Sequence, residues 1–335
     1  MNVDELLKRY AAGERNFSEV NLMGANLEHA NLSGINLSRA SLGSACLRRT
    51  VLTGACLNQA FLYGADLSYA KLSQASLTDA DLTKAKLLGT QLVRANLSGA
   101  KISGAVLTAV NLASANLRGV NLCGANLSGI NLRSANLTEA NLSWANLNGA
   151  RLSGAQLDGA LLNAIKLSGA YLNGVNLSGA GLDGVNFSTA KLSGANFSGA
   201  NLTAANLSDC QLRFAILKSA NLRSADLNGS SLRKADLSEA NLTKANLSDT
   251  DLSEADLTNA NLNLANLSSA DLRRADLRGA YLWKAVLNRA LLKGANLTGA
   301  NLRGAQMEAS DWREAVLTGA ILPDGTTYAP DRAGL

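Results

Sequence analysis

A five-residue repeat runs through almost the whole chain and limits what the chain can fold into. Stepping by five from Phe17 to Leu322 gives 62 positions, since (322 − 17)/5 + 1 = 62, and 56 of them are Leu. The residue two places before each position is Ala in 47 of 61 cases, from Val20 to Ala320. The six positions that are not Leu are also large and apolar: Phe17, Ile102, Phe187, Phe197, Met307 and Trp312.

Neither a straight helix nor a straight strand can bury this series. On an α-helix a step of five residues rotates the side chain by about 500°, so the Leu series spreads around the axis. On a strand an odd period sends successive Leu to opposite faces. All the Leu and Ala point inward only if the chain turns a corner inside each three-residue step, which winds it into a solenoid.

The residues between the apolar positions favour such corners. In the run Leu97–Ser98–Gly99–Ala100, Gly stands third of four, where a type II turn requires positive φ. Other corners carry a charged residue in that place, and we expect them to use a turn without positive φ. Examples are Asp79, Lys84, Arg94 and Glu139.

The motif resembles that of the pentapeptide-repeat family, whose phrase is A-(D/N)-L-x-x, and the resemblance covers about residues 16–322. It implies an all-β fold, a right-handed quadrilateral parallel β-solenoid. The repeat itself supports a solenoid, whereas the choice of four sides over three depends on the resemblance. Four units per coil would give about 15 coils, because 62/4 is 15.5. Similar proteins are abundant in cyanobacteria, and most have no assigned biochemical role.

Both ends of the chain depart from the repeat. Residues 1–15 predict an N-terminal capping helix, because Asn2 and Glu5 have the spacing of a capping box and Gly13 is placed to end the helix. Its apolar residues share one face: Val3, Leu6, Leu7 and Tyr10.

Between the ends, residues 16–322 are expected to form one cooperative solenoid with every five-step position buried. Trp312 is large enough to plug the last coil, and residues 323–335 form a C-terminal tail.

Sequence features also predict a compartment. The N-terminus carries Asp4 and Glu5 and no long apolar run, so we expect neither a signal peptide nor a transmembrane helix. The four cysteines show no paired spacing and are expected to be free thiols in a reducing environment. They are Cys46, Cys56, Cys123 and Cys210. We therefore expect a soluble cytoplasmic protein.

Residues suited to catalysis or metal binding are scarce. The single histidine, His29, is predicted at an exposed corner, where nothing converges on it. Asp236, Asp256 and Asp276 would form a column on one face, which indicates a solvated charged surface, with a cation site as the alternative. We expect no enzyme activity, no cofactor, no metal and no small-molecule substrate, because an interior packed with Leu and Ala leaves no pocket.

Charge bears on nucleic-acid partners and on mimicry of nucleic acid. Some relatives in the resembled family are thought to imitate duplex DNA and so modulate DNA topoisomerase (gyrase), which requires an acidic surface. This chain has 31 Lys and Arg against 26 Asp and Glu, a net charge of +5. Residues 1–167 hold 15 basic and 10 acidic residues, and the remainder holds 16 of each. Neither half is acidic, which disfavours mimicry.

One outward row is basic. Five residues occupy the same position on one face, with Ser253 filling the gap: Arg213, Arg233, Arg273, Lys293 and Arg313. Phosphates could follow this row, but carboxylates share the face: Asp251, Glu254, Asp271, Asp311 and Glu314. Neutralisation between adjacent coils is the favoured interpretation, so we expect neither a nucleic-acid nor a membrane partner.

A second outward feature is apolar. Five residues within about two coils are predicted to face solvent, and we call them the apolar patch: Leu264, Tyr281, Trp283, Val286 and Leu291. Clustered exposed aromatic residues indicate a binding site for a protein partner. Equally, the tail with Tyr328 and Leu335 could fold back over the patch. A weaker cluster lies nearer the N-terminus: Phe61, Tyr63 and Tyr69.

The function predicted from the sequence is a non-catalytic interaction or structural scaffold with an unknown protein partner. It is expected to be a monomer, or a homodimer through an end or through the apolar patch. The alternative is a modulator of DNA topoisomerase.

Overall fold

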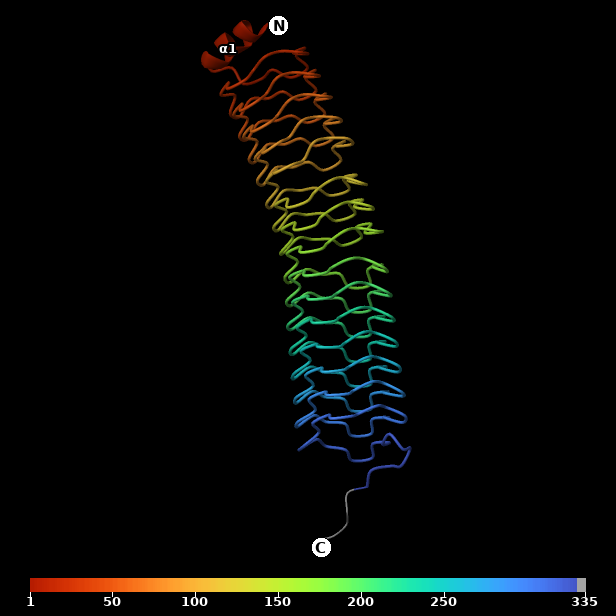
Figure 1. The fold of residues 1–335 in the computed structure, drawn as a ribbon. Coiled ribbons are helices and arrows are strands. Elements are labelled where there is room, and N and C mark those ends of the chain that lie inside the picture. The colour runs from red at the N-terminus through yellow and green to blue at the C-terminus, as the bar shows by residue number, and fades with distance from the viewer. Residues whose placement is uncertain (330–335) are drawn as a thin grey trace. The chain divides into compact units, whose positions relative to one another are not determined.

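The computed structural model describes residues 1–329. Its contacts fall into two compact units, Met1–Lys166 and Leu167–Leu335, and each is described by itself. Figure 1 shows stacked coils in both units and one short helix at the start of the first. The prediction of one cooperative solenoid over residues 16–322 stays a prediction, because a division by contacts does not measure cooperativity. In a solenoid each coil touches only its neighbours, so a uniform repeat does not by itself bind the whole chain into one compact body.

The first unit begins with helix α1, Val3–Ala11. The predicted cap is present, because the Asn2 side chain accepts a hydrogen bond of 2.8 Å from the Glu5 N–H. Leu6 is fully buried and Tyr10 donates its hydroxyl proton to Ser33 O at 2.7 Å, which holds the helix against the first coils. Leu7 was expected on the same buried face but is exposed, so the contact is narrower than predicted.

Every coil contains twenty residues. Parallel bridges join positions twenty apart, from Asn16↔Asn36 to Asn146↔Lys166 in the first unit and from Tyr171↔Lys191 to Asn301↔Ile321 in the second. Four five-residue repeats therefore make one coil, as the four-sided prediction requires. The right-handed sense and the number of coils stay predictions.

The buried positions follow the repeat. Every five-step residue from Phe17 to Leu302 is buried. The chain turns between one apolar position and the next, since Ala45 N donates to Leu42 O at 3.1 Å, and adjacent coils are joined by bonds such as Leu42 N to Phe61 O at 2.7 Å. The turn thus absorbs the odd residue, and both Leu and Ala reach the interior.

Asn before Leu has a structural role at these corners. Asn36 Oδ1 accepts a hydrogen bond from Ser38 N at 3.0 Å, an Asx-turn that starts the corner. Asn36 Nδ2 donates to Asn16 Oδ1 of the previous coil, also at 3.0 Å. One Asn can therefore both fix its corner and extend a side-chain ladder between coils.

The prediction for charged corners is wrong. Asp79, Lys84, Arg94 and Glu139 all have φ between 56° and 60°. The third corner residue has positive φ in 36 non-glycine and 25 glycine cases, and 36 + 25 accounts for all 61 corners from Glu19 to Gly319. The reason is stacking: the Glu139 N–H donates to Asp158 O in the next coil at 2.9 Å, so each corner must match its neighbour whatever its side chain prefers.

The prediction that Trp312 plugs the last coil is also wrong. Trp312 is 43% exposed, and Met307, Leu317 and Leu322 are only half-buried. An interior side chain is covered by the coils on both sides of it, and within the described residues no full coil follows this one. Residues 323–329 instead pair locally, with Tyr328 N donating to Ala320 O at 2.7 Å and an antiparallel bridge Ile321↔Thr327.

The wall of the first unit contains one opening that the sequence did not predict. Segments 102–105 and 121–126 line a cavity of about 230 Å³. Bridges are present on the neighbouring sides, at Asn96↔Asn116 and Asn111↔Asn131. The expectation that stacked Leu and Ala leave no pocket is therefore wrong at this place, where the two segments are separated.

Candidate interaction surfaces of the second unit

The basic row is assembled by the coil register. Bridges Ser231↔Asp251, Asp251↔Asp271, Asp271↔Leu291 and Leu291↔Asp311 run down one side of the second unit. The row residues stand two positions after these bridge residues, so Arg233, Ser253, Arg273, Lys293 and Arg313 lie on successive coils about 4.8 Å apart.

Charge pairs neutralise most of this row, in two ways. Arg233 reaches Glu254 of the next coil at 2.6 Å, and Lys293 reaches Glu314 of the next coil at 3.3 Å. Lys234 also contacts Glu254, at 3.3 Å. Hydrogen bonds from Arg233 and then Lys234 hold the pKa of Glu254 below its usual value. Neutralisation between coils is therefore confirmed for these two row residues.

Arg273 and Arg313 pair within their own coils instead. Each turns back to the Asp two residues before it, Arg273 to Asp271 at 2.6 Å and Arg313 to Asp311 at 2.8 Å. The hydrogen bonds from Arg313 lower the pKa of Asp311 to about 2. Arg213 differs from both groups, because its guanidinium lies 5.8 Å from the ring centre of Phe214.

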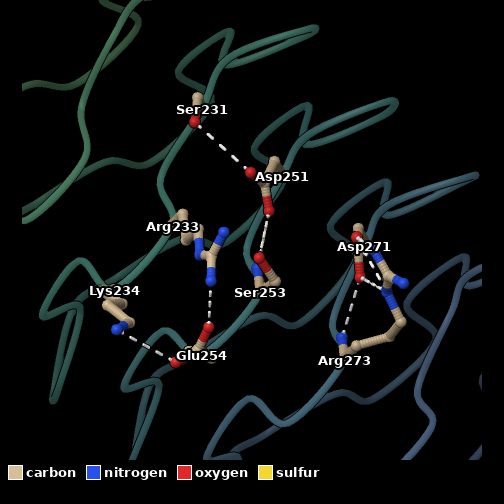
Figure 2. Close-up of polar contacts among 8 residues, drawn as sticks. All are labelled: Ser231, Arg233, Lys234, Asp251, Ser253, Glu254, Asp271 and Arg273. Atoms are coloured by element: carbon tan, nitrogen blue, oxygen red, sulfur yellow. Dashed lines mark hydrogen bonds and ion pairs between the residues drawn. The ribbon is translucent and has the colours of Figure 1, made fainter.

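A cavity of about 440 Å³ opens where the row is interrupted by Ser253. Figure 2 shows Arg233 and Glu254 on one side of Ser253 and the Arg273–Asp271 pair on the other. The residues that line the cavity are Arg233, Ser253, Glu254, Arg273, Arg274, Lys293, Gly294 and Glu314. We call this cavity the Ser253 notch.

The apolar patch is exposed, as predicted, at four of its five residues. Leu264, Tyr281, Trp283 and Leu291 are between 39% and 52% exposed, and Val286 is half-buried. Leu264 N donates to Trp283 O at 2.9 Å, so these two residues lie on adjacent coils. Lys284 Nζ lies 4.6 Å from the centre of the Trp283 ring.

The described part of the tail is placed beside the last coil. Residues 323–329 pair with Gly319–Leu322 through Tyr328 and Thr327. Tyr328 is exposed, and Leu335, the other tail residue expected over the patch, lies outside the described residues.

The weaker N-terminal cluster belongs to the first unit. Phe61 and Tyr63 stack with ring centres 6.0 Å apart, and Lys84 lies 5.5 Å from the Tyr63 ring. Tyr69 is exposed beside Arg49.

Sequence reasoning missed three other exposed aromatic residues, Tyr171 at a bridge position and Trp144 and Phe214 at corners. Both corner residues stand third in the corner with positive φ, at 63° and 60°, and Trp144 is 68% exposed. The signal was available, because a large apolar residue at that corner position has no interior place to go.

The remaining candidate residues have ordinary surroundings. His29 is largely exposed, with Nε2 3.8 Å from Glu28. Asp236, Asp256 and Asp276 form the predicted column, and Asp276 pairs with Arg278 at 2.6 Å. Over residues 1–329, no group of three or more His, Cys, Asp or Glu could hold a metal ion.

Two further features concern the state of the cysteines and the length of the helix. All four cysteines are free. Cys210 is buried, and burial raises the pKa of its thiol to about 12. No helix in the described part of the chain has the length and apolar character needed to cross a membrane.

Comparison with solved structures finds other five-residue-repeat proteins. HetL from the cyanobacterium Nostoc, described as involved in regulation of heterocyst differentiation, is 29% identical over 98% of this chain and 100% of its own, with a TM-score of 0.22. A protein from the Arabidopsis thaliana thylakoid lumen is 33% identical over 30% of this chain and 69% of its own, with a TM-score of 0.29. QnrB1, a plasmid-mediated fluoroquinolone resistance protein, is 17% identical over 54% of this chain and 90% of its own, with a TM-score of 0.35.

The family is assigned from the sequence. No curated protein matches the chain. The family described as pentapeptide repeats matches in segments that begin at residue 16 and end at residue 324, and these segments cover far more than half of the chain. The chain therefore belongs to the pentapeptide-repeat family.

Proposed function

We propose that this chain is a non-catalytic protein-interaction scaffold of the cytoplasm, and that a protein partner docks on the apolar patch. The observation that carries the proposal is the exposure of Tyr281 and Trp283, at 52% and 40%, beside Leu264 and Leu291 on adjoining coils. Large rings that are half in water and half packed are the residues that most often dominate binding between proteins.

Hydrogen bonds between adjacent coils hold the backbone of the patch, which favours binding. Trp283 N donates to Asn263 Oδ1 at 2.9 Å, and Trp283 O accepts from Leu264 N at the same distance. Lys284 Nζ also lies 4.6 Å from the centre of the Trp283 ring, a cation–π contact. The backbone under the patch is therefore ordered before a partner binds, which lowers the entropy cost of association.

A scaffold role also fits the chemistry of the rest of the chain. The interior of the coils is lined mostly by Leu and Ala, and the single histidine is exposed, with its Nε2 3.8 Å from Glu28. The free thiols of all four cysteines support a reducing compartment.

Modulation of DNA topoisomerase by DNA mimicry is the weaker alternative. It requires a surface that presents negative charge as duplex DNA does, and this chain carries a net charge of +5. The proposed scaffold does not require any particular net charge.

Affinity capture with matched variants tests the proposal. Full-length chain, Trp283→Ala and Tyr171→Ala are immobilised and exposed to extract of the source cells. Tyr171 is the control because it is a similarly exposed aromatic residue of the same unit, at a bridge position away from the patch. We expect the wild type and Tyr171→Ala to retain the same partner and Trp283→Ala to weaken its binding by about 2 kcal/mol.

Two outcomes would overturn the proposal. One is equal capture by all three proteins, which would place binding elsewhere. The other is a wild-type dimer in light scattering that Trp283→Ala converts to monomer, because the patch would then join two copies of this chain.

A further inference from the structure

The Ser253 notch has the composition of an anion site, and we propose that it binds the phosphoryl group of a small phosphorylated molecule, or free phosphate. Nothing in the proposed scaffold function requires this site, and it lies on the basic row and not in the apolar patch. Its volume of about 440 Å³ holds a phosphate together with part of the molecule that carries it.

Positive charge exceeds negative charge in the notch. Its lining contains four cations, Arg233, Arg273, Arg274 and Lys293, and two carboxylates, Glu254 and Glu314, which gives 4 − 2 = +2. Three charged residues contact the lining from outside, Lys234, Asp271 and Asp251, the last through the Ser253 hydroxyl at 2.6 Å, so the excess falls to +1. The remaining excess favours an anion.

Arg274 supplies a charge that the protein does not use. Among residues 1–329 it forms no ion pair, whereas the other three cations of the lining each have a carboxylate partner. Its backbone is also held at φ 59°, a conformation that is unfavourable for a non-glycine residue. Arg274 N donates to Lys293 O at 3.1 Å, so the stacking of coils fixes it beside the cavity.

Arg233 supplies a hydrogen-bond donor that the protein does not use. Its Nη2 donates to Glu254 Oε1 at 2.6 Å, but its Nε is buried and has no acceptor. Leaving such a donor unpaired is unfavourable, and a turn of the Arg233 side chain toward a ligand oxygen in the notch would satisfy it. Arginine forks match phosphate oxygens in geometry as well as in charge.

Small residues make the space for this ligand. Ser253 stands in the row at a place where neighbouring coils carry a long cation. Gly294 stands twenty residues after Arg274, at the same corner of the next coil. A Cβ at Gly294 would lie 3.7 Å from Arg274 Cγ, in ordinary contact. The absence of larger side chains at these two places keeps the four cations around an open volume.

The same face argues against a continuous nucleic-acid backbone. Asp251, Asp271 and Asp311 recur along it, so successive phosphates would meet carboxylates. A single phosphoryl group meets only the notch, where the cations are in excess.

Titration of the full-length chain at constant ionic strength tests the site. The probes are inorganic phosphate, glycerol 3-phosphate and acetate, and calorimetry measures the binding of each. We expect one site for the first two probes and no saturable binding of acetate. Phosphate binding as tight as glycerol 3-phosphate binding would identify free phosphate as the ligand, and tighter binding of the ester would identify a phosphorylated molecule.

Two corner variants make the test independent of folding. Arg274→Gly removes the unpaired guanidinium and relieves the positive φ, so the fold is not weakened. Arg289→Gly makes the same change at another exposed corner of the same unit, where φ is 60°, outside the notch. We expect Arg274→Gly to weaken phosphate binding about ten- to a hundredfold and Arg289→Gly to leave it unchanged.

The proposal is overturned if phosphate does not bind, if acetate binds as well as phosphate, or if the two variants lose affinity equally. Protein capture by the apolar patch is expected to survive Arg274→Gly, so failure of this site and failure of the scaffold function are distinguishable.

Discussion

The same substitution, Gly to Ala, should have opposite effects at a corner and on a side of the second unit. Gly199 is a corner residue with φ 64°, and a Cβ built on it meets no atom within 4 Å. Gly181 bridges to Asn201 with ordinary φ, and its Cβ would also meet nothing within 4 Å. Packing is therefore the same in both cases, and only the backbone conformation differs.

The expected magnitudes follow from that conformation. Gly199→Ala should destabilise by about 1–2 kcal/mol, the cost of a left-handed conformation for a residue with a Cβ. Gly181→Ala should stabilise by about 0.4–1 kcal/mol, because Ala loses less chain entropy on folding. For a unit of this size 1 kcal/mol corresponds to about 2–4 °C in the unfolding midpoint.

Differential scanning calorimetry of the two full-length variants measures both shifts. Since the contacts form two units, the transition of the second unit must be resolved from that of the first. If Gly199→Ala raises the midpoint as Gly181→Ala does, the corners are not strained and the conformational argument is wrong.

Two further predictions concern the core and the acid range. Leu172 is fully buried, so Leu172→Asp should cost more than about 4 kcal/mol and remove the cooperative transition of the second unit, whereas an unchanged midpoint would contradict the inward Leu series. Hydrogen bonds from Arg313 lower the pKa of Asp311 from 3.8 to about 2, so the contribution of this pair to stability is present above pH 3.8 and is lost as the pH falls through about 2. Arg313→Gln should return the carboxyl pKa toward 3.8 in an NMR titration, and an unchanged low value would show that Arg313 is not the cause.

The sequence predicted the features that depend on the repeat. The two-then-three spacing placed the buried residues correctly at Ala40, Leu42 and Ala45, and the same counting predicted the exposure of His29 and Trp283. Nearer the N-terminus Leu27 is buried, but Ala25 and Ala30 are only half-buried. Such positions depend only on which face of a coil a residue occupies.

Features that depend on neighbouring coils were not predictable in the same way. Glu139 adopts positive φ because the next coil demands it, although its own preference is against it. Trp312 is inward by register but lacks a covering coil. The Ser253 notch depends on Arg273 turning back to Asp271 and leaving the gap beside Ser253 unfilled, a rotamer choice that no spacing encodes.

Bridges join positions twenty residues apart, so a change in chain length affects the buried interior and the outer surface differently. A deletion of five residues inside one unit keeps every Leu over a Leu, so the interior survives. It also carries each later residue around one corner: Lys293, five positions earlier, would leave the column of Arg233 and join that of Asn228 and Ser248. Only changes of whole coils, twenty residues at a time, keep a surface built from several coils intact. Insertions or deletions of five residues therefore keep such a chain folded. A binding surface built from several coils is kept only when the length changes by a multiple of twenty residues.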